Sequence, residues 1–310
     1  MDRRSAVPDR RRAAGASLIE RAGFTPDAPP PTPAVRHNPV LALVHDGSDP
    51  GILGIVEAGM AEALAGANLL LALHSLPAGD AASLREFLRR HRPAGVVLLP
   101  PLAEREDLVR LCAEARVRCT RLGPAREGAA PSQPTIAVDE RRAGRDLVGW
   151  LVAQGHVRIG FVAGPDGSLS AQQRELGYLD AMADAALDRG PALIVPGDNS
   201  FESGIEAGRL LLEISPRPTA ICASNDEMAA GVLHAAAQMR LAVPADLSVA
   251  GLDDGPLSAR ILPALTTMHI PWGLMGHEAA RRMTARGTAG GTETAFAARL
   301  IVRDSVQTLT

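Results

Sequence analysis

The feature that most constrains the fold is an alternation, from Pro39 onward, of short apolar runs with longer amphipathic segments. The apolar runs predict strands at 40–44, 69–73, 96–99, 119–122, 159–163, 193–195, 220–223 and 247–250. The segments between them predict helices at 53–65, 82–90, 104–115, 140–154, 171–186, 203–212, 226–239 and 274–286. Short, uninterrupted apolar strands separated by helices are typical of parallel sheets with both faces covered. The alternation therefore predicts an α/β, doubly wound fold.

The repeating units divide into two similar groups around Gly155. A chain of 310 residues is long enough to bury two separate cores. The division therefore indicates two open sheets in tandem rather than one large sheet. In such sheets ligands lie outside the carboxyl ends of the strands. Polar residues directly after each strand are therefore the candidates for ligand contact.

The first segment, residues 1–38, differs in composition from the rest. Its start is basic through Arg3, Arg4, Arg10, Arg11 and Arg12. A proline-rich stretch at 27–33 is expected to be extended, and a short helix is expected at 13–22. The arginine cluster could contact phosphate, but its composition favours a solvated, disordered tail.

Composition and charge exclude several classes of protein. A net charge of −3 argues against a surface that follows nucleic acid along its whole length. No apolar run approaches the roughly 18 residues of a membrane-spanning helix, and no apolar stretch follows Arg12 to form a signal peptide. We therefore expect a cytoplasmic protein. Its three cysteines, Cys112, Cys119 and Cys222, have no metal-ligand spacing and fit buried apolar positions.

Short hydrogen-bonding side chains follow several predicted strands. They occur in the stretch His-Asp-Gly-Ser-Asp-Pro at 45–50, which includes Asp46 and Ser48, and at Asp139, Ser224, Asn225, Asp226, Asp253 and Asp254. Arg174 lies early in a helix after another strand. Asp and Asn bind hydroxyls, and Arg offers a planar fork of donors. The set suits a polyhydroxylated or carboxylated small molecule.

Helix capping is the alternative interpretation of the same positions, because Asp, Asn and Ser are also preferred N-caps. For Asp226, followed by Glu227 and a helical run, we favour the cap. For Asp253 both interpretations stay open.

The sequence gives little support to an enzymatic function. No phosphate-binding loop, His-Glu-x-x-His, Gly-x-Ser-x-Gly or dinucleotide-binding motif follows a predicted strand. His156 precedes a buried strand, away from the strand ends, so we interpret it as structural. We expect no catalytic residue, metal or cofactor.

Several ordered segments resemble one known family. They are Gly155-His156-x-Arg158-Ile159-x-Phe161-x-x-Gly164, Arg174-x-x-Gly177-Tyr178, Pro218-Thr219-Ala220-Ile221-x-Ala223-Ser224-Asn225-Asp226-x-Met228-Ala229-x-Gly231, Val243-Pro244-x-Asp246-Leu247-Ser248-Val249-x-Gly251-x-Asp253-Asp254, Pro263-x-Leu265-Thr266-Thr267, Met275-Gly276 and Leu300-Ile301-Val302-Arg303-x-Ser305. In this order they resemble the LacI/GalR transcription regulators, from Val40 to the C-terminus.

The resemblance implies two periplasmic-binding-protein-like subdomains with an effector in the cleft between them. The chain of that fold crosses three times, here near Phe161, His269 and Gly290. This implies a first subdomain of 39–160 plus 270–290 and a second of 161–269 plus 291–310. Effector contacts carried over by motif are Asp139, Arg174, Asn225 and Asp253, with the loop 46–52 closing the cleft from the other side. The resemblance also implies a homodimer, with surface candidates at 53–65 and 82–90.

Two departures from the family bear on the effector. Many relatives place aromatic residues after the first strand, but here Asp49 and Pro50 are followed by Gly51 and Ile52. Another aromatic position is replaced by Asn199, although Phe201 is close by. These changes favour a sugar-like effector held by hydrogen bonds over a stacked flat ring. The expected ligand-binding set is Asp46, Ser48, Asp139, Arg174, Asn199, Asn225 and Asp253.

The larger departure concerns the helix-turn-helix head that relatives carry. Residues 7–12 and 18–27 resemble only its end, and the helix that reads the major groove has no counterpart. Four prolines within 28–33 oppose a hinge helix. We therefore expect a ligand-responsive regulator with an incomplete DNA-binding head, which binds DNA only if that head is restored. The alternative is a stand-alone intracellular sugar sensor, whereas a periplasmic receptor would need an export signal.

Overall fold

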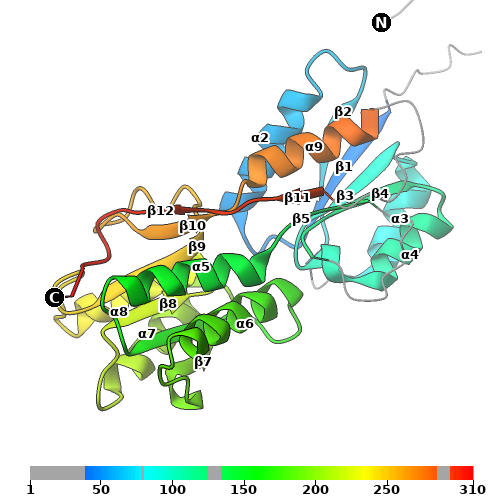
Figure 1. Ribbon diagram of the computed structural model, residues 1–310. Helices are drawn as coiled ribbons and strands as arrows, with labels where there is room; N and C mark the ends of the chain where they lie inside the picture. Colours follow the sequence, from blue (N-terminus) through cyan, green and yellow to red (C-terminus); the bar gives the residue numbers. More distant parts are fainter. Residues whose placement is uncertain (1–38, 78–79, 125–133, 285–293, 310) are drawn as a thin grey trace, which may run out of the picture. The chain divides into compact units, whose positions relative to one another are not determined.

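The computed structural model describes residues 39–77, 80–124, 134–284 and 294–309 (Figure 1). The described residues all belong to one compact unit, Pro39–Thr310. The helix expected at 13–22 and the remnant of the DNA-binding head lie outside them. None of the helices in the described ranges has the length and apolar character needed to cross a membrane.

The first sheet has the strand order β11-β5-β4-β3-β1-β2, and its strands are parallel. Its members are β1 (Val40–His45), β2 (Leu70–Ser75), β3 (Gly95–Leu98), β4 (Arg118–Leu122), β5 (Thr135–Val138) and β11 (Thr294–Phe296). Its helices are α2 (Pro50–Ala63), α3 (Ala81–His91), α4 (Glu106–Glu114) and α9 (Trp272–Thr284). Figure 1 shows α2 beside α9, and α3 beside α4.

Strand β1 shows why this sheet requires helices on both faces. Successive side chains of a strand point to opposite faces. Leu41 and Leu43 pack in the core cluster that contains α2 and α9, whereas Ala42 and Val44 pack in the cluster that contains α3 and α4. The uninterrupted apolar run therefore has a buried partner on each side, as the doubly wound prediction requires.

The second sheet has the order β12-β10-β9-β8-β6-β7, in which β12 alone runs antiparallel to its neighbour. Its members are β6 (Ile159–Ala163), β7 (Ile194–Pro196), β8 (Ala220–Ala223), β9 (Ser248–Asp253), β10 (Thr266–His269) and β12 (Arg299–Ile301). Helices α5 (Glu140–Ala153) and α6 (Leu169–Asp184) pack together, as do α7 (Phe201–Glu213) and α8 (Asp226–Gln238). Phe161 of β6 stacks on Tyr178 of α6 with ring centroids 4.9 Å apart.

Each strand and helix predicted from residue 40 onward has a counterpart within a few residues, but β5, β10, β11 and β12 were missed. Strand β10 carries polar side chains that are buried and bonded. The Thr266 hydroxyl accepts from the Arg303 amide at 2.9 Å, and the Thr267 hydroxyl donates to Asp226 at 2.6 Å. Such a strand has no apolar signature to find in the sequence.

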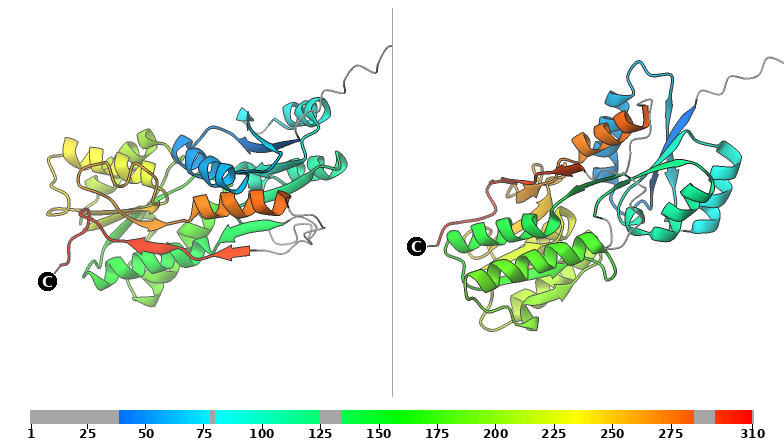
Figure 2. Two further views of the ribbon diagram at one scale, coloured as in Figure 1. Left: turned by 90° about the horizontal axis from the view of Figure 1, so that it is seen from above. Right: turned by 45° about the vertical axis from the view of Figure 1, so that its right-hand side comes forward.

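Two of the three crossings of the chain between the two sheets lie at other positions than expected. The chain leaves the first sheet after β5, and α5 packs on α6, so the first crossing lies near Asp139 and not Phe161. The second lies between β10 and α9, next to His269. The third lies between β11 and β12, after Phe296, and not near Gly290 (Figure 2). The predicted boundaries were wrong here because β5 and β11 were not recognised as strands of the first sheet.

Two of the residues interpreted as structural are buried as expected. His156 is fully buried, and its ring nitrogens lie 3.0 Å from the Thr219 hydroxyl and 3.2 Å from the Gln307 carbonyl. The buried cysteines include Cys222 in β8. Neither residue lines the cavity described below.

Helices α5 and α6 approach so closely that a glycine is required between them. A Cβ atom at Gly177 would lie 2.2 Å from the carbonyl oxygen of Arg141 and 2.7 Å from the amide nitrogen of Arg145. Both are backbone atoms, which cannot move without shifting α5. On α5 itself, a Cβ at Gly149 would meet nothing within 4 Å.

We therefore predict opposite effects of Gly177→Ala and Gly149→Ala on the free energy of unfolding. The first should lower it by about 1–3 kcal/mol through overpacking. The second should raise it by about 0.5–1 kcal/mol, because alanine is the better helix former. Urea unfolding of both variants checks this. Equal stability of the Gly177→Ala variant and the wild type would show that the two helices do not pack this closely.

Candidate functional site

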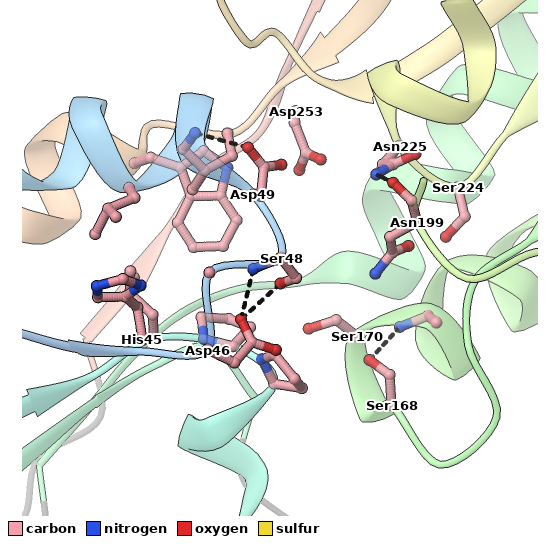
Figure 3. A pocket seen from close by; sticks show the side chains of 18 of the residues that line it. His45, Asp46, Ser48, Asp49, Ser168, Ser170, Asn199, Ser224, Asn225 and Asp253 are labelled. Atoms are coloured by element: carbon pink, nitrogen blue, oxygen red, sulfur yellow. Dashed lines mark hydrogen bonds between the residues drawn. The ribbon is translucent and has the colours of Figure 1, made fainter. Parts of the chain in front are cut away.

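A cavity lies where the carboxyl ends of the two sets of strands meet (Figure 3). From the first sheet and its helices it is lined by His45, Asp46, Gly47, Ser48, Asp49, Ile52, Leu53, Leu99, Pro100, Pro101 and Trp272. From the second it is lined by Ser168, Ser170, Ala171, Arg174, Asn199, Ser224, Asn225 and Asp253. The lining mixes apolar walls with a few converging polar groups, which is typical of a small-molecule site.

The structure brings six of the seven expected ligand-binding residues to this cavity. They are Asp46, Ser48, Arg174, Asn199, Asn225 and Asp253. Asp139 is the exception. Its side chain is exposed and accepts a hydrogen bond from the Arg142 amide at 2.9 Å, which caps α5. The capping interpretation therefore fits Asp139, and its neighbour Glu140 is the carboxylate that turns inward.

Arg174 is the buried centre of the polar wall. Its Nε donates to Glu140 at 2.6 Å, its Nη2 to Oδ1 of Asp253 at 2.9 Å, and its Nη1 to the carbonyl of Ser224 at 2.5 Å. The residue is only 5% exposed. Burial opposes its charge, but Asp253 and Glu140 outweigh this and raise the pKa of Arg174 above its ordinary value. The guanidinium therefore stays charged and holds three elements in fixed positions.

Asp253 ends β9 in an unusual backbone conformation. Its φ is +120° and that of Asp254 is +57°, values that non-glycine residues rarely adopt. Such strain is often found at binding sites. The residues after Asp253 form turns and not a helix, so Asp253 is not a cap. One oxygen of its carboxylate, Oδ1, accepts from Arg174, and the carboxylate faces the cavity.

The cap of α8 is Asn225 and not Asp226 as we expected. The Asn225 Oδ1 accepts from the Met228 amide at 2.9 Å, and its Nδ2 donates to the carbonyl of Asn199 at 3.0 Å. Asp226 is the first residue of the helix, where it accepts from the Thr267 hydroxyl and from the Gly255 amide at 2.8 Å. Burial and Asp253 raise the pKa of Asp226 well above its usual range. Sequence reasoning placed a cap at this helix but selected the neighbouring residue.

Sequence reasoning also missed Glu104, which does not line the cavity but binds the start of α6 beside it. It ends a short 3₁₀ turn, Leu102–Glu104, after β3 and is only 5% exposed. Its carboxylate accepts from the Leu169 amide at 2.6 Å, from the Ser170 amide at 3.1 Å and from the Ser168 hydroxyl at 3.3 Å. These are bonds from the first half to the start of α6 in the second half. No signal marks Glu104 in the sequence, because its partners lie more than sixty positions away.

Asp49 was also left out of the expected set, although it stands in the stretch that suggested Asp46 and Ser48. Its Oδ1 accepts from the Ile52 amide at 2.9 Å and caps α2. Burial and the nearby Asp253 carboxylate raise the pKa of Asp49 to about 6. Glu227 adds to the same effect. Carboxylates from the two halves therefore face each other across the cavity.

Two open parallel-stranded sheets joined by three crossings, with a polar cavity at their carboxyl ends, define a two-lobed binding protein. The periplasmic binding protein-like domain family matches residues 148–306. The regulator CelR of Thermobifida fusca is 29% identical over 299 residues, which cover 93% of this chain and 87% of that protein. Catabolite control protein A of Priestia megaterium is 38% identical over 152 residues, 49% of this chain. This chain spans a little under half of that relative, 46%.

The fold comparison agrees with the sequence comparisons. The structure of a CelR–cellobiose complex superposes with a TM-score of 0.78 at 26% identity, over 97% of this chain and 92% of that one. The chain belongs to the periplasmic binding protein-like domain family, and CelR, which it resembles in sequence and in fold, is named as a transcriptional regulator.

We predict that Asp49 makes the ligand-free protein lose stability as the pH rises. Its pKa is about 6 in the folded state and about 3.9 in an unfolded chain. The folded state therefore binds this proton more tightly than the unfolded chain does. The stability that the protonated Asp49 gives to the folded state is lost as the pH rises from about 4 to about 6. Asp49→Asn removes this loss and retains the oxygen that caps α2. In urea unfolding the variant should gain about 1–3 kcal/mol relative to the wild type between pH 4.5 and pH 7.

A stability difference between wild type and Asp49→Asn that does not change with pH would contradict this assignment. The ordinary acid titrations of other groups are common to both proteins and cancel in the comparison.

Proposed function

We propose that this chain is the effector-binding part of an intracellular transcription regulator and that its cleft binds a small hydroxyl-rich molecule, a sugar or sugar derivative. One observation carries the proposal, namely the buried pair of Arg174 and Asp253 in the cavity wall. A guanidinium has five N–H groups, and the three bonds of Arg174 leave two of them for a ligand. Asp253 has one oxygen engaged by Arg174 and another available.

The opposite and neighbouring walls add complementary groups. The Asn199 amide has no hydrogen-bond partner among the described side chains and offers both a donor and an acceptor. Asp46 and Ser48 lie on the facing loop, where Asp46 accepts from the Ser48 hydroxyl at 2.7 Å. A hydroxyl both donates and accepts, so a polyol satisfies such a mixed lining without carrying charge. The relative CelR, whose structure contains cellobiose, supports a carbohydrate as the ligand class.

A binding role is favoured over catalysis because the relative CelR is named as a transcriptional regulator. An effector that contacts both halves stabilises whichever relative arrangement of the halves it fits better, which is how binding shifts a conformational equilibrium. The segment with the resemblance to a DNA-binding head, residues 1–38, lies outside the described ranges. DNA as a partner therefore stays a prediction that depends on that head.

We also propose a homodimer, as expected from the family resemblance. Apolar side chains are exposed on the edge strand β2, where Leu70 and Leu73 are exposed by 55% and 45%. An apolar edge strand is a common site of association, and symmetric pairs are the commonest soluble oligomers. Sedimentation at micromolar concentration should give a dimer. A monomer alone under those conditions would contradict this proposal.

The central prediction is that Asp253→Asn weakens effector binding while the protein stays folded. The substitution keeps the shape of the side chain and removes a charge-assisted hydrogen bond, so affinity should fall about tenfold or more. Arg174→Ala is a poorer test, because it leaves Glu140 and Asp253 buried without their partner and should cost about 3–5 kcal/mol of stability.

The measurement is calorimetric titration with whichever neutral sugar, among cellobiose, ribose and glucose, raises the melting temperature most. Asp139→Asn is the matched control, since Asp139 is an exposed cap outside the cavity and Asn caps equally well. Wild-type affinity in the Asp253→Asn variant would show that Asp253 does not contact the effector.

A further inference from the structure

We infer that the effector of this cleft carries no phosphate or carboxylate, and that Asp49 and Asp253, one from each half, bind its hydroxyl or amino donors. The inference rests on the proposed function and narrows the class of molecule that the cleft accepts. It depends on how this chain fills its helix termini, on the charge of the lining and on polar atoms left without partners.

Three of the helices that begin at the cavity, α2, α6 and α8, have N-terminal amides that a side chain of the protein already binds. Helix N-termini are the natural sites for phosphate and carboxylate groups, because their free N–H groups and the helix dipole favour negative charge. Here Asp49 binds the Ile52 amide at the start of α2, Glu104 binds the Leu169 and Ser170 amides at the start of α6, and Asn225 binds the Met228 amide at the start of α8. These side chains occupy the amides that an anionic ligand would bind, and two of them are carboxylates.

The charge of the lining also opposes an anion. Asp46, Asp49 and Asp253 contribute carboxylates to the cavity. Among the lining residues that the structure describes, Arg174 is the single arginine, and the sequence contains no lysine. Arg174 is already bonded to Glu140 and Asp253, so its charge is compensated. A phosphate placed here would meet an excess of negative charge in a partly desolvated site.

Independent evidence for a polar ligand comes from buried atoms without partners. The Ser170 hydroxyl is 9% exposed at the residue level and has no hydrogen-bond partner among the described residues. Figure 3 shows it directed into the cavity. Trp272 also lines the cavity, is 5% exposed, and its Nε1 has no partner. Leaving such groups unpaired costs free energy, and a hydroxyl-bearing ligand can pair with the Ser170 hydroxyl.

The facing carboxylates complete the argument. The Asp49 side chain lies on the loop before α2, and Asp253 approaches from the end of β9 on the other half (Figure 3). Each uses Oδ1 within the protein, for the Ile52 amide and for Arg174 respectively. Asp253 raises the pKa of Asp49, which reflects their repulsion. A ligand that donates hydrogen bonds to both carboxylates relieves this repulsion and joins the two halves, whereas an anion adds to it.

The first test is a binding panel of matched molecules on the full chain at pH 7.5. The probes are glucose, glucosamine, glucose 6-phosphate and glucuronate, together with ribose and ribose 5-phosphate, and cellobiose. Thermal shift identifies binders, and calorimetric titration measures them. We expect binding by a neutral or amino member, with its phosphate or carboxylate counterpart on the order of tenfold weaker or more.

The outcomes separate the inference from the proposed function. Tighter binding of a sugar phosphate or uronate than of its neutral counterpart would overturn the inference and leave a small-molecule effector site standing. A panel in which no molecule binds would contradict the proposed function and, with it, the inference.

The second test uses Asp49→Asn, which removes the charge and keeps the capping oxygen. With the best neutral binder and its phosphate ester, the preference for the neutral molecule should shrink by on the order of tenfold in this variant. The control is Asp80→Asn, since Asp80 caps α3 through the Ala82 and Ser83 amides and does not line the cavity. An unchanged preference in Asp49→Asn would show that Asp49 does not select against anionic ligands. If this variant is unstable, the panel on the wild-type protein still decides whether the cleft rejects anionic ligands.

Discussion

The cleft depends on the burial of one arginine. Arg174 lies on α6 in the interior, where a guanidinium without partners would be strongly unfavourable. Its partners come from α5, from the loop after β8 and from the end of β9. The close approach of α5 and α6 at Gly177 brings Glu140 within reach of the same side chain. A single charged group therefore requires the fold to bring four elements together, and the polar wall of the cavity is the result.

The two halves also contact each other outside the cavity lining. Glu104 places a carboxylate on the start of α6 and so connects the halves directly. Asp253, which faces the cavity, is followed by Asp254, whose carboxylate contacts His269 at 2.9 Å and Arg303 at 2.5 Å. His269 ends β10, next to the second crossing, and Arg303 follows β12 and the third. The residue that faces the ligand is thus adjacent in sequence to one that holds the connecting segments.

Much of this fold was predictable because its central strands, such as β1, β3, β6 and β8, are buried on both faces and therefore appear as uninterrupted apolar runs. The strand-end rule likewise located the cavity through Asp46, Asn225 and Asp253. Strand β10 was not predictable, since its threonines satisfy their hydroxyls through partners distant in sequence. Adjacent polar pairs were also ambiguous, because which of Asp139 and Glu140 turns inward depends on the start of α5, a detail of one residue. Glu104 lies beyond any local pattern, since only the assembled cleft gives it partners.

The most direct test of this account is a crystal structure of the full chain with a neutral sugar that binds it in solution. The account predicts the sugar between the two sheets, with its hydroxyls within about 3.2 Å of Asp253 and of a free N–H group of Arg174. It further predicts a hydroxyl or amino group of the ligand within the same distance of Asp49. A sugar bound elsewhere on the protein, or bound in the cleft without contacting Arg174 and Asp253, would contradict it.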